Sequence, residues 1–186
     1  MHGVLSYDQI HDIVKHRFEE IAWAYRYFPH LRGPVVKPSS VCMVGLLFAR
    51  PESKLAKEEI IPGLDYFHLR SGNHIDFFCA GYGAQDPQDE DFTSQNEVSQ
   101  AGWMFSPRRF NEIREKVEAQ CGWRYSGGSD LTLANAQYSP GGGVKIELDR
   151  SVKCYLDEFK RIGAINSVHE FFESIFRYAE NAKEEG

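Results

Sequence analysis

The sequence has few cysteines, and none of them lie close together. Its four cysteines are far apart and form no C-x-x-C motif: Cys42, Cys79, Cys121 and Cys154. Structural zinc sites and disulfide frameworks need closely spaced ligands or partners, so this spacing argues against both. We therefore expect four reduced thiols, no metal and no cofactor, in a protein that is located in the cytoplasm.

Long apolar runs and dense clusters of cations are also missing. The first residues, M-H-G-V-L-S-Y-D, contain no basic segment followed by an apolar one, so we expect no secretory signal. No apolar run approaches the roughly 20 residues that cross a bilayer, so we expect no membrane partner. The net charge is −6 and Lys and Arg are scattered, which argues against nucleic acid as a partner.

What remains is the composition of a folded α/β protein. The 186 residues are 42% hydrophobic and 26% charged, which fits one domain with a substantial core. We expect a single domain over 1–186. Within it, an N-terminal helix and connection occupy 1–40, a sheet core with a polar loop at 83–100 occupies 41–148, and C-terminal helices occupy 149–180.

The first half of the chain predicts a helix, a strand, a kinked helix and a second strand. The capping box Ser6-x-x-Gln9 opens an amphipathic helix that runs to about Phe28. Val41 to Phe48 is an apolar strand, and Pro62 kinks the helix that follows it. The run from Ile75 to Tyr82 is nearly unbroken in its apolar character, so we expect it to be the central strand of a mixed sheet.

The second half predicts one helix, short strands and two closing helices. Ser106 and Pro107 are a strong helix start. Trp103–Phe105 is either a short strand or an anchor that returns the polar loop to the core. Short strands are expected at Trp123–Tyr125, Leu131–Ala136 and Val144–Leu148. A helix capped by Asp149 should follow, and the capping box at Ser167 should open the last helix.

These elements give the order β-α-β-α-β-β-α, with an added N-terminal helix and an extra C-terminal helix. This order resembles the thioredoxin-like fold, a three-layer α/β domain whose mixed sheet would have about four to five strands here. The resemblance is one of element order alone. The redox C-x-x-C of that family is missing, because P-E-S-K-L-A-K at 51–57 holds no cysteine, and so is the proline before its third strand. Redox activity is therefore not implied.

His74 and Asp76 are the candidate catalytic residues. Side chains alternate along a strand, so His74 and Asp76 should share one face while Cys79 points to the other. A Cys-His-Asp nucleophilic set is therefore poorly placed, but a His-Asp pair is suited to acid–base work. The structural alternative, which we favour, is that Asp76 pairs with His74 or Arg70.

Two further features have a simpler structural interpretation. Four carboxylates lie within 86–91, but they lack the spacing of a calcium loop, so a solvated acidic loop is expected rather than a metal site. The glycine clusters at 127–128 and 141–143 match no phosphate-binding motif, and hairpin turns explain both. The loop 83–100 is long and polar, which predicts either mobility or function.

Aromatic residues on the terminal helices carry the functional hypothesis. The candidate partner-binding residues are Trp23 and Tyr27 on the first helix, and Phe172 and Phe176 on the last. A helix that is apolar on more than one side needs a second partner surface, although burial within the same chain is the simpler interpretation. We expect a non-catalytic domain that binds a protein partner or itself as a homo-oligomer. The alternative is a small hydrolase that uses His74 and Asp76, with loop 83–100 as a lid.

Overall fold

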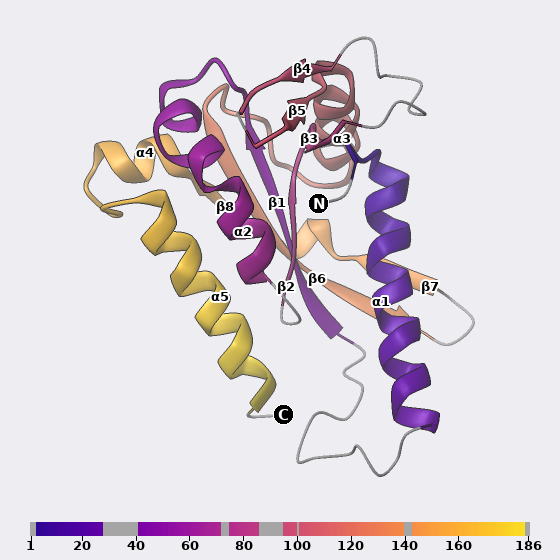
Figure 1. Cartoon of the computed structure of the whole chain (residues 1–186). Coiled ribbons are helices and arrows are strands. Elements are labelled where there is room, and N and C mark those ends of the chain that lie inside the picture. The colour runs from indigo at the N-terminus through magenta and orange to yellow at the C-terminus, as the bar shows by residue number, and fades with distance from the viewer. Residues whose placement is uncertain are drawn as a thin grey trace.

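The protein is a mixed α/β structure with a five-stranded mixed sheet and helices on both sides of it (Figure 1). The computed structural model describes residues 3–27, 41–71, 75–85, 95–99, 101–139 and 143–184, and side chains throughout these ranges except at 21–27 and 182–184. In the part of the chain that is described, no helix is long and apolar enough to cross a membrane.

The central strands of the five-stranded sheet are β1 (Val41–Ala49) and β6 (Ser129–Ser139). β1 is parallel to β2 (Ile75–Cys79) and antiparallel to β6. On its far side, β6 pairs with β7 (Gly143–Ile146) and with β8 (Val152–Tyr155), both antiparallel. Most of β1 is buried, as expected of a strand covered on both faces.

The stretch expected to be the central strand is instead the edge of this sheet, and this prediction was wrong. The run from Ile75 to Tyr82 is broken by a turn at Ala80 and Gly81, where Gly81 has a φ of 80°. A Cβ at Gly81 would lie 2.8 Å from the Ser106 carbonyl oxygen, so glycine is needed there. The chain continues as β3 (Tyr82–Ala84) in a second sheet, of order β3-β5-β4, with β5 at Trp103–Phe105 and β4 at Asn96–Glu97.

One face of the five-stranded sheet, called face B here, carries Asp76, Ala134 and Val144. It is covered by α1 (Tyr7–Tyr27) and α3 (Pro107–Gln120), which lie together on the right in Figure 1. The expected caps form: the Ser6 hydroxyl accepts from Gln9 N at 3.2 Å, and the Ser106 hydroxyl accepts from Arg109 N at 3.1 Å.

The opposite face, face A, carries Phe77, Leu133 and Val152. It is covered by α2 (Leu64–Ser71) and α5 (Val168–Glu184), which lie to the left of β1 in Figure 1. The segment before α2 is kinked as Pro62 predicts, because a π-helical turn at Ala56–Ile60 passes into a 3-10 turn at Ile61–Gly63. The Ser167 hydroxyl accepts from Glu170 N at the start of α5.

Two predictions for the second half of the chain were wrong. Residues 123–125 form no strand, and the ring of Trp123 packs against that of Phe48 with centroids 4.7 Å apart. The long helix expected after Asp149 is a 3-10 turn (Leu148–Arg150), then β8, then the short α4 (Leu156–Arg161). Cys154 is buried opposite Leu131, so pairing with β6 prevails over the helical spacing of these residues.

Candidate functional site

Asp76 is held by α1. Its carboxylate forms an ion pair with Arg17, and both side chains are mostly buried, at 12% and 15% exposed. Cys42 Sγ lies 3.8 Å from Asp76 Oδ2, within the range of a weak hydrogen bond. The sequence predicted a structural partner for Asp76 but named His74 or Arg70. Arg70 instead binds α5, and His74 lies outside the described residues.

The thiol nearest to Asp76 along β2 is not poised for catalysis. Asp76 is opposite Val44 and Cys79 is opposite Leu47, so these two side chains point to different faces of the sheet. Burial raises the pKa of the Cys79 thiol to about 12. A thiol that stays protonated at neutral pH is a poor nucleophile, so Cys79 does not complete a Cys-His-Asp set.

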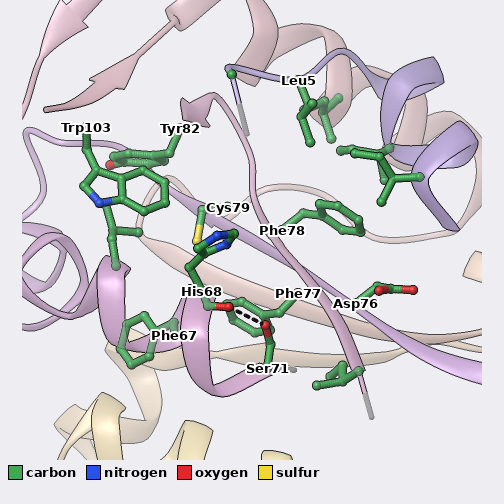
Figure 2. A pocket seen from close by; sticks show the side chains of 16 residues that line it. Leu5, Phe67, His68, Ser71, Asp76, Phe77, Phe78, Cys79, Tyr82 and Trp103 are labelled. Carbon is green, nitrogen blue, oxygen red and sulfur yellow. Dashed lines mark hydrogen bonds between the residues drawn. The ribbon is translucent and has the colours of Figure 1, made fainter. Parts of the chain in front are cut away.

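A groove of about 200 Å³ runs along β2, between the N-terminal half of α1 and α2, and we call it the β2-edge groove. Figure 2 shows its side chains. His68, Cys79, Tyr82 and Trp103 gather at one end, and Phe78 and Leu5 lie further along. Trp103 is fixed by a 2.8 Å hydrogen bond from its Nε1 to Asp65 Oδ1. The lining is therefore largely apolar, with aromatic and aliphatic side chains and few polar ones.

The aromatic residues expected to bind partners have different environments. Phe172 is 0% and Phe176 1% exposed, and both pack against Phe77 with ring centroids 5.1 and 5.5 Å apart. These two rings anchor α5 to face A, and a partner would meet the other residues of α5. The side chains of Trp23 and Tyr27 lie outside the description of α1.

A polar network also fastens α5 to α2. Arg70 binds Glu173 at 3.1 Å and Glu180 at 2.5 Å, and the Tyr66 hydroxyl donates to Glu173 at 2.5 Å. These hydrogen bonds from Tyr66 and Arg70 lower the pKa of Glu173 to about 2. The position of α5 on the sheet is thus set by both rings and charges.

Beside α5, the part of face A made by β6 and β8 is open. A groove of about 460 Å³, called the α5 groove here, is lined by Met43, Leu133, Arg150, Val152, Ile175 and Tyr178 among others. Val152 is 60% and Tyr178 64% exposed, which is unusual for large apolar side chains that line one hollow. The described residues thus include one apolar surface that the chain's own helices leave uncovered.

Sequence reasoning missed this groove for an identifiable reason. Val152 falls within the helix expected after Asp149, whereas it belongs to β8. The alternation in V-K-C-Y, with two β-branched or aromatic residues, was a signal for a strand, but four residues are too few to separate it from a helix. Tyr178 follows Phe172 and Phe176 on the same helix, and the sequence gives no sign that it points outward.

Metal ligation finds no support among the residues that the structure describes, where no group of three His, Cys, Asp or Glu side chains converges. The acidic residues at 86–91 and the glycines at 141–142 lie outside those ranges. The turn at Gly127 and Gly128 is built by Asp130, which accepts from Ser126 N at 2.8 Å, so its role is structural.

Comparison of the chain with protein-family models, with curated proteins and with solved structures returned no match.

Proposed function

We propose that this chain is a non-catalytic domain that works by protein association, and that the α5 groove binds a second copy of the chain. The observation that carries the proposal is the pairing of Val152 and Tyr178 in one apolar hollow on an otherwise well-covered sheet. Exposed apolar surface of this kind is typical of interaction sites, and tyrosine is enriched in them.

A second copy is the occupant that the groove itself suggests. Tyr178 protrudes from α5 at the groove's edge, while Met43 and Leu133 form a half-buried floor beside it. In a two-fold arrangement, the ring from each copy enters the hollow of the other, so one patch serves both sides of the interface. Phe172 and Phe176 support this arrangement from below, because they fix α5 against Phe77 of β2.

The test is the mass of the protein in solution across a range of concentrations. We expect the parent to be a dimer with a Kd of about 1–100 μM. Tyr178→Glu and Val152→Lys each place a charge in the hollow and should shift the protein to the monomer. Ile162→Lys is the matched control, since Ile162 is exposed but lies after α4, outside the groove.

Two results contradict the proposal. One is a parent that remains monomeric up to about 1 mM. The other is a dimer that all three variants retain, because the interface would then lie elsewhere. A dimer that is lost in Ile162→Lys alone would assign the association to the end of α4.

We also infer a thioredoxin-like arrangement within one domain over 1–186. It is supported by β1 parallel to β2 and antiparallel to β6, with β6 antiparallel to β7. β8 is then an addition to that order. None of the four cysteines forms a disulfide, which supports a reducing location such as the cytoplasm.

A further inference from the structure

The shape of the β2-edge groove shows that it lies along the rim of the sheet. The five consecutive residues of β2, Ile75–Cys79, all line it. A hollow over one face of a strand would be lined by every second residue, because side chains alternate between the faces. A hollow that is lined by every consecutive residue must instead lie along the edge of the strand, where side chains from both faces reach it.

Helices form walls on both sides of this edge. On the side of face A, α2 contributes Leu64, Phe67, His68 and Ser71, spaced three and four residues apart as one stripe. On the side of face B, α1 contributes Ile10 and Ile13. The groove is therefore a slot, with a strand edge as its floor and apolar helix faces as its walls.

The backbone of β2 presents hydrogen-bonding groups to this slot. Ala80 N donates to the Leu47 carbonyl at 2.8 Å. The backbone N–H and C=O groups of successive residues in a strand point alternately to its two sides. Those of Asp76 and Phe78 therefore point to β1, like Ala80 N, while those of Phe77 and Cys79 point to the slot. Among the described residues, β2 pairs with β1 alone.

β2 lacks two of the features that commonly protect a sheet edge. Its sequence, I-D-F-F-C, contains no lysine and no proline. Its single charge, Asp76, is neutralised by Arg17 on face B. An edge that is largely apolar and contains neither lysine nor proline is suited to accept another strand.

The N-terminal residues of the chain already pair with the strand that follows β2. Just beyond β2, Gly3 forms a parallel bridge with Ala84 of β3. The approach is close, because a Cβ at Gly83 would come within 2.4 Å of the Gly3 carbonyl carbon. Leu5, which follows, lines the slot before the chain turns into α1. The N-terminal segment thus pairs with the edge of β3, whereas the edge of β2 has no strand beside it among the described residues.

We propose that the β2-edge groove binds an extended peptide of a partner protein, which adds a strand to β2. Main-chain hydrogen bonds to Phe77 and Cys79 hold the peptide. Its side chains alternate between the α2 wall, beside His68, and the α1 wall, beside Ile13. The peptide is uncharged in this stretch, because the partly exposed parts of the walls are the aliphatic side chains of Leu5 and Ile13 and the imidazole of His68. This site is separate from the α5 groove and does not depend on self-association.

The test uses a defined probe, the extended peptide acetyl-Thr-Val-Thr-Val-Thr-amide, added to the ¹⁵N-labelled protein. With the peptide at about 1 mM, we expect hydrogen exchange at the Phe77 and Cys79 amides to slow about tenfold. The matched control is the same peptide with alternate backbone nitrogens methylated, which removes the donors of one edge. That peptide should leave both exchange rates unchanged.

Variants on α1 locate the site. Ile13→Trp fills the slot and should abolish the protection, whereas Lys15→Trp, on the exposed side of the same helix, should retain it. Tyr178→Glu should also retain it, which separates this proposal from the one on self-association. The proposal is overturned if no protection appears, or if the methylated peptide protects equally, which would indicate an apolar cavity that takes side chains only. Protection that rises with protein concentration alone would assign the edge to a second copy.

Discussion

The two faces of the five-stranded sheet are covered to different extents. On face B, α1 reaches the end of β6, where the ring of Phe18 stacks on that of Tyr138 with centroids 5.7 Å apart, and the ring of Phe110 in α3 meets that of Phe48 at 6.1 Å. On face A, the rings of α2 and α5 gather over Phe77 of β2. The β6 and β8 side of face A is left to the α5 groove.

This difference separates residues that stabilise the fold from residues that are free to bind. An aromatic residue under a helix contributes to stability in the isolated chain, whereas an exposed one contributes only when a partner covers it. Composition does not distinguish the two groups, because Phe176 and Tyr178 lie two residues apart on α5. Their environments are opposite because the side chain of Phe176 points to the sheet, whereas that of Tyr178 is exposed to solvent.

The largest expected effect is in the closed core of face B. Phe110→Ala removes a fully buried ring that contacts Phe48 and Tyr125, so it should lower the free energy of unfolding by about 3–5 kcal/mol. Leu133→Ala, on the open side of face A, should cost less, about 1–2 kcal/mol, since Leu133 is only half-buried. Urea titrations of both variants below the dimer Kd measure the two losses. Equal losses would show that the faces are equally packed.

A smaller loss is expected where α1 is fastened to β2. Asp76→Asn leaves Arg17 without its carboxylate in a mostly buried setting, so we expect a loss of about 1–3 kcal/mol. A thermal melt beside a mass measurement checks this, and the dimer should persist. A variant that is more stable than the parent would support the hydrolase alternative, because catalytic carboxylates are often held in unfavourable surroundings.

The link between α2 and α5 should respond to acid. Because the pKa of Glu173 is lowered from 4.5 to about 2, its ionised form stabilises the fold above about pH 4.5, and this stabilisation is lost as the pH falls toward about 2. Glu173 is partly solvated, so the effect should be modest. Urea melts of the parent and Glu173→Gln should differ at neutral pH and converge near about pH 2. A constant difference across this range would exclude Glu173 as the acid-sensitive group.

The smallest effect on stability is expected at the α5 groove. Val152→Lys and Tyr178→Glu alter exposed side chains, so in the monomer each should change the free energy of unfolding by less than about 0.5 kcal/mol. Dilute samples measured by urea titration provide the comparison with Phe110→Ala. A loss of several kcal/mol at Tyr178 would mean that this ring belongs to the core.

The sequence predicted the elements that local signals define. The capping boxes at Ser6 and Ser167, the start at Ser106-Pro107 and the kink at Pro62 all depend on neighbouring residues, and all are found. The position of a strand within the sheet depends on pairing between distant segments. The apolar run at Ile75 therefore gave no indication that it lies at the edge, or that Gly81 divides it.

The candidate site was harder to predict, because it is made by the packing of distant segments. That Asp76 needs a partner follows from its apolar surroundings, but Arg17 is 59 residues away and only the fold brings the two together. The α5 groove likewise joins residues of β1, β6, β8 and α5. Outward-facing residues such as Tyr178 are recognisable only when the neighbouring helix positions are known.

Oxidation of methionine side chains tests the central claim most directly. Met43 lines the α5 groove, whereas Met104 is buried in β5 and serves as an internal reference. We expect the Met43 oxidation rate to rise when the parent is diluted below its dimer Kd, while the Met104 rate stays constant. In Tyr178→Glu, Met43 should react at the fast rate at every concentration. A Met43 rate that does not depend on protein concentration in the parent would contradict the claim that a second copy covers this groove.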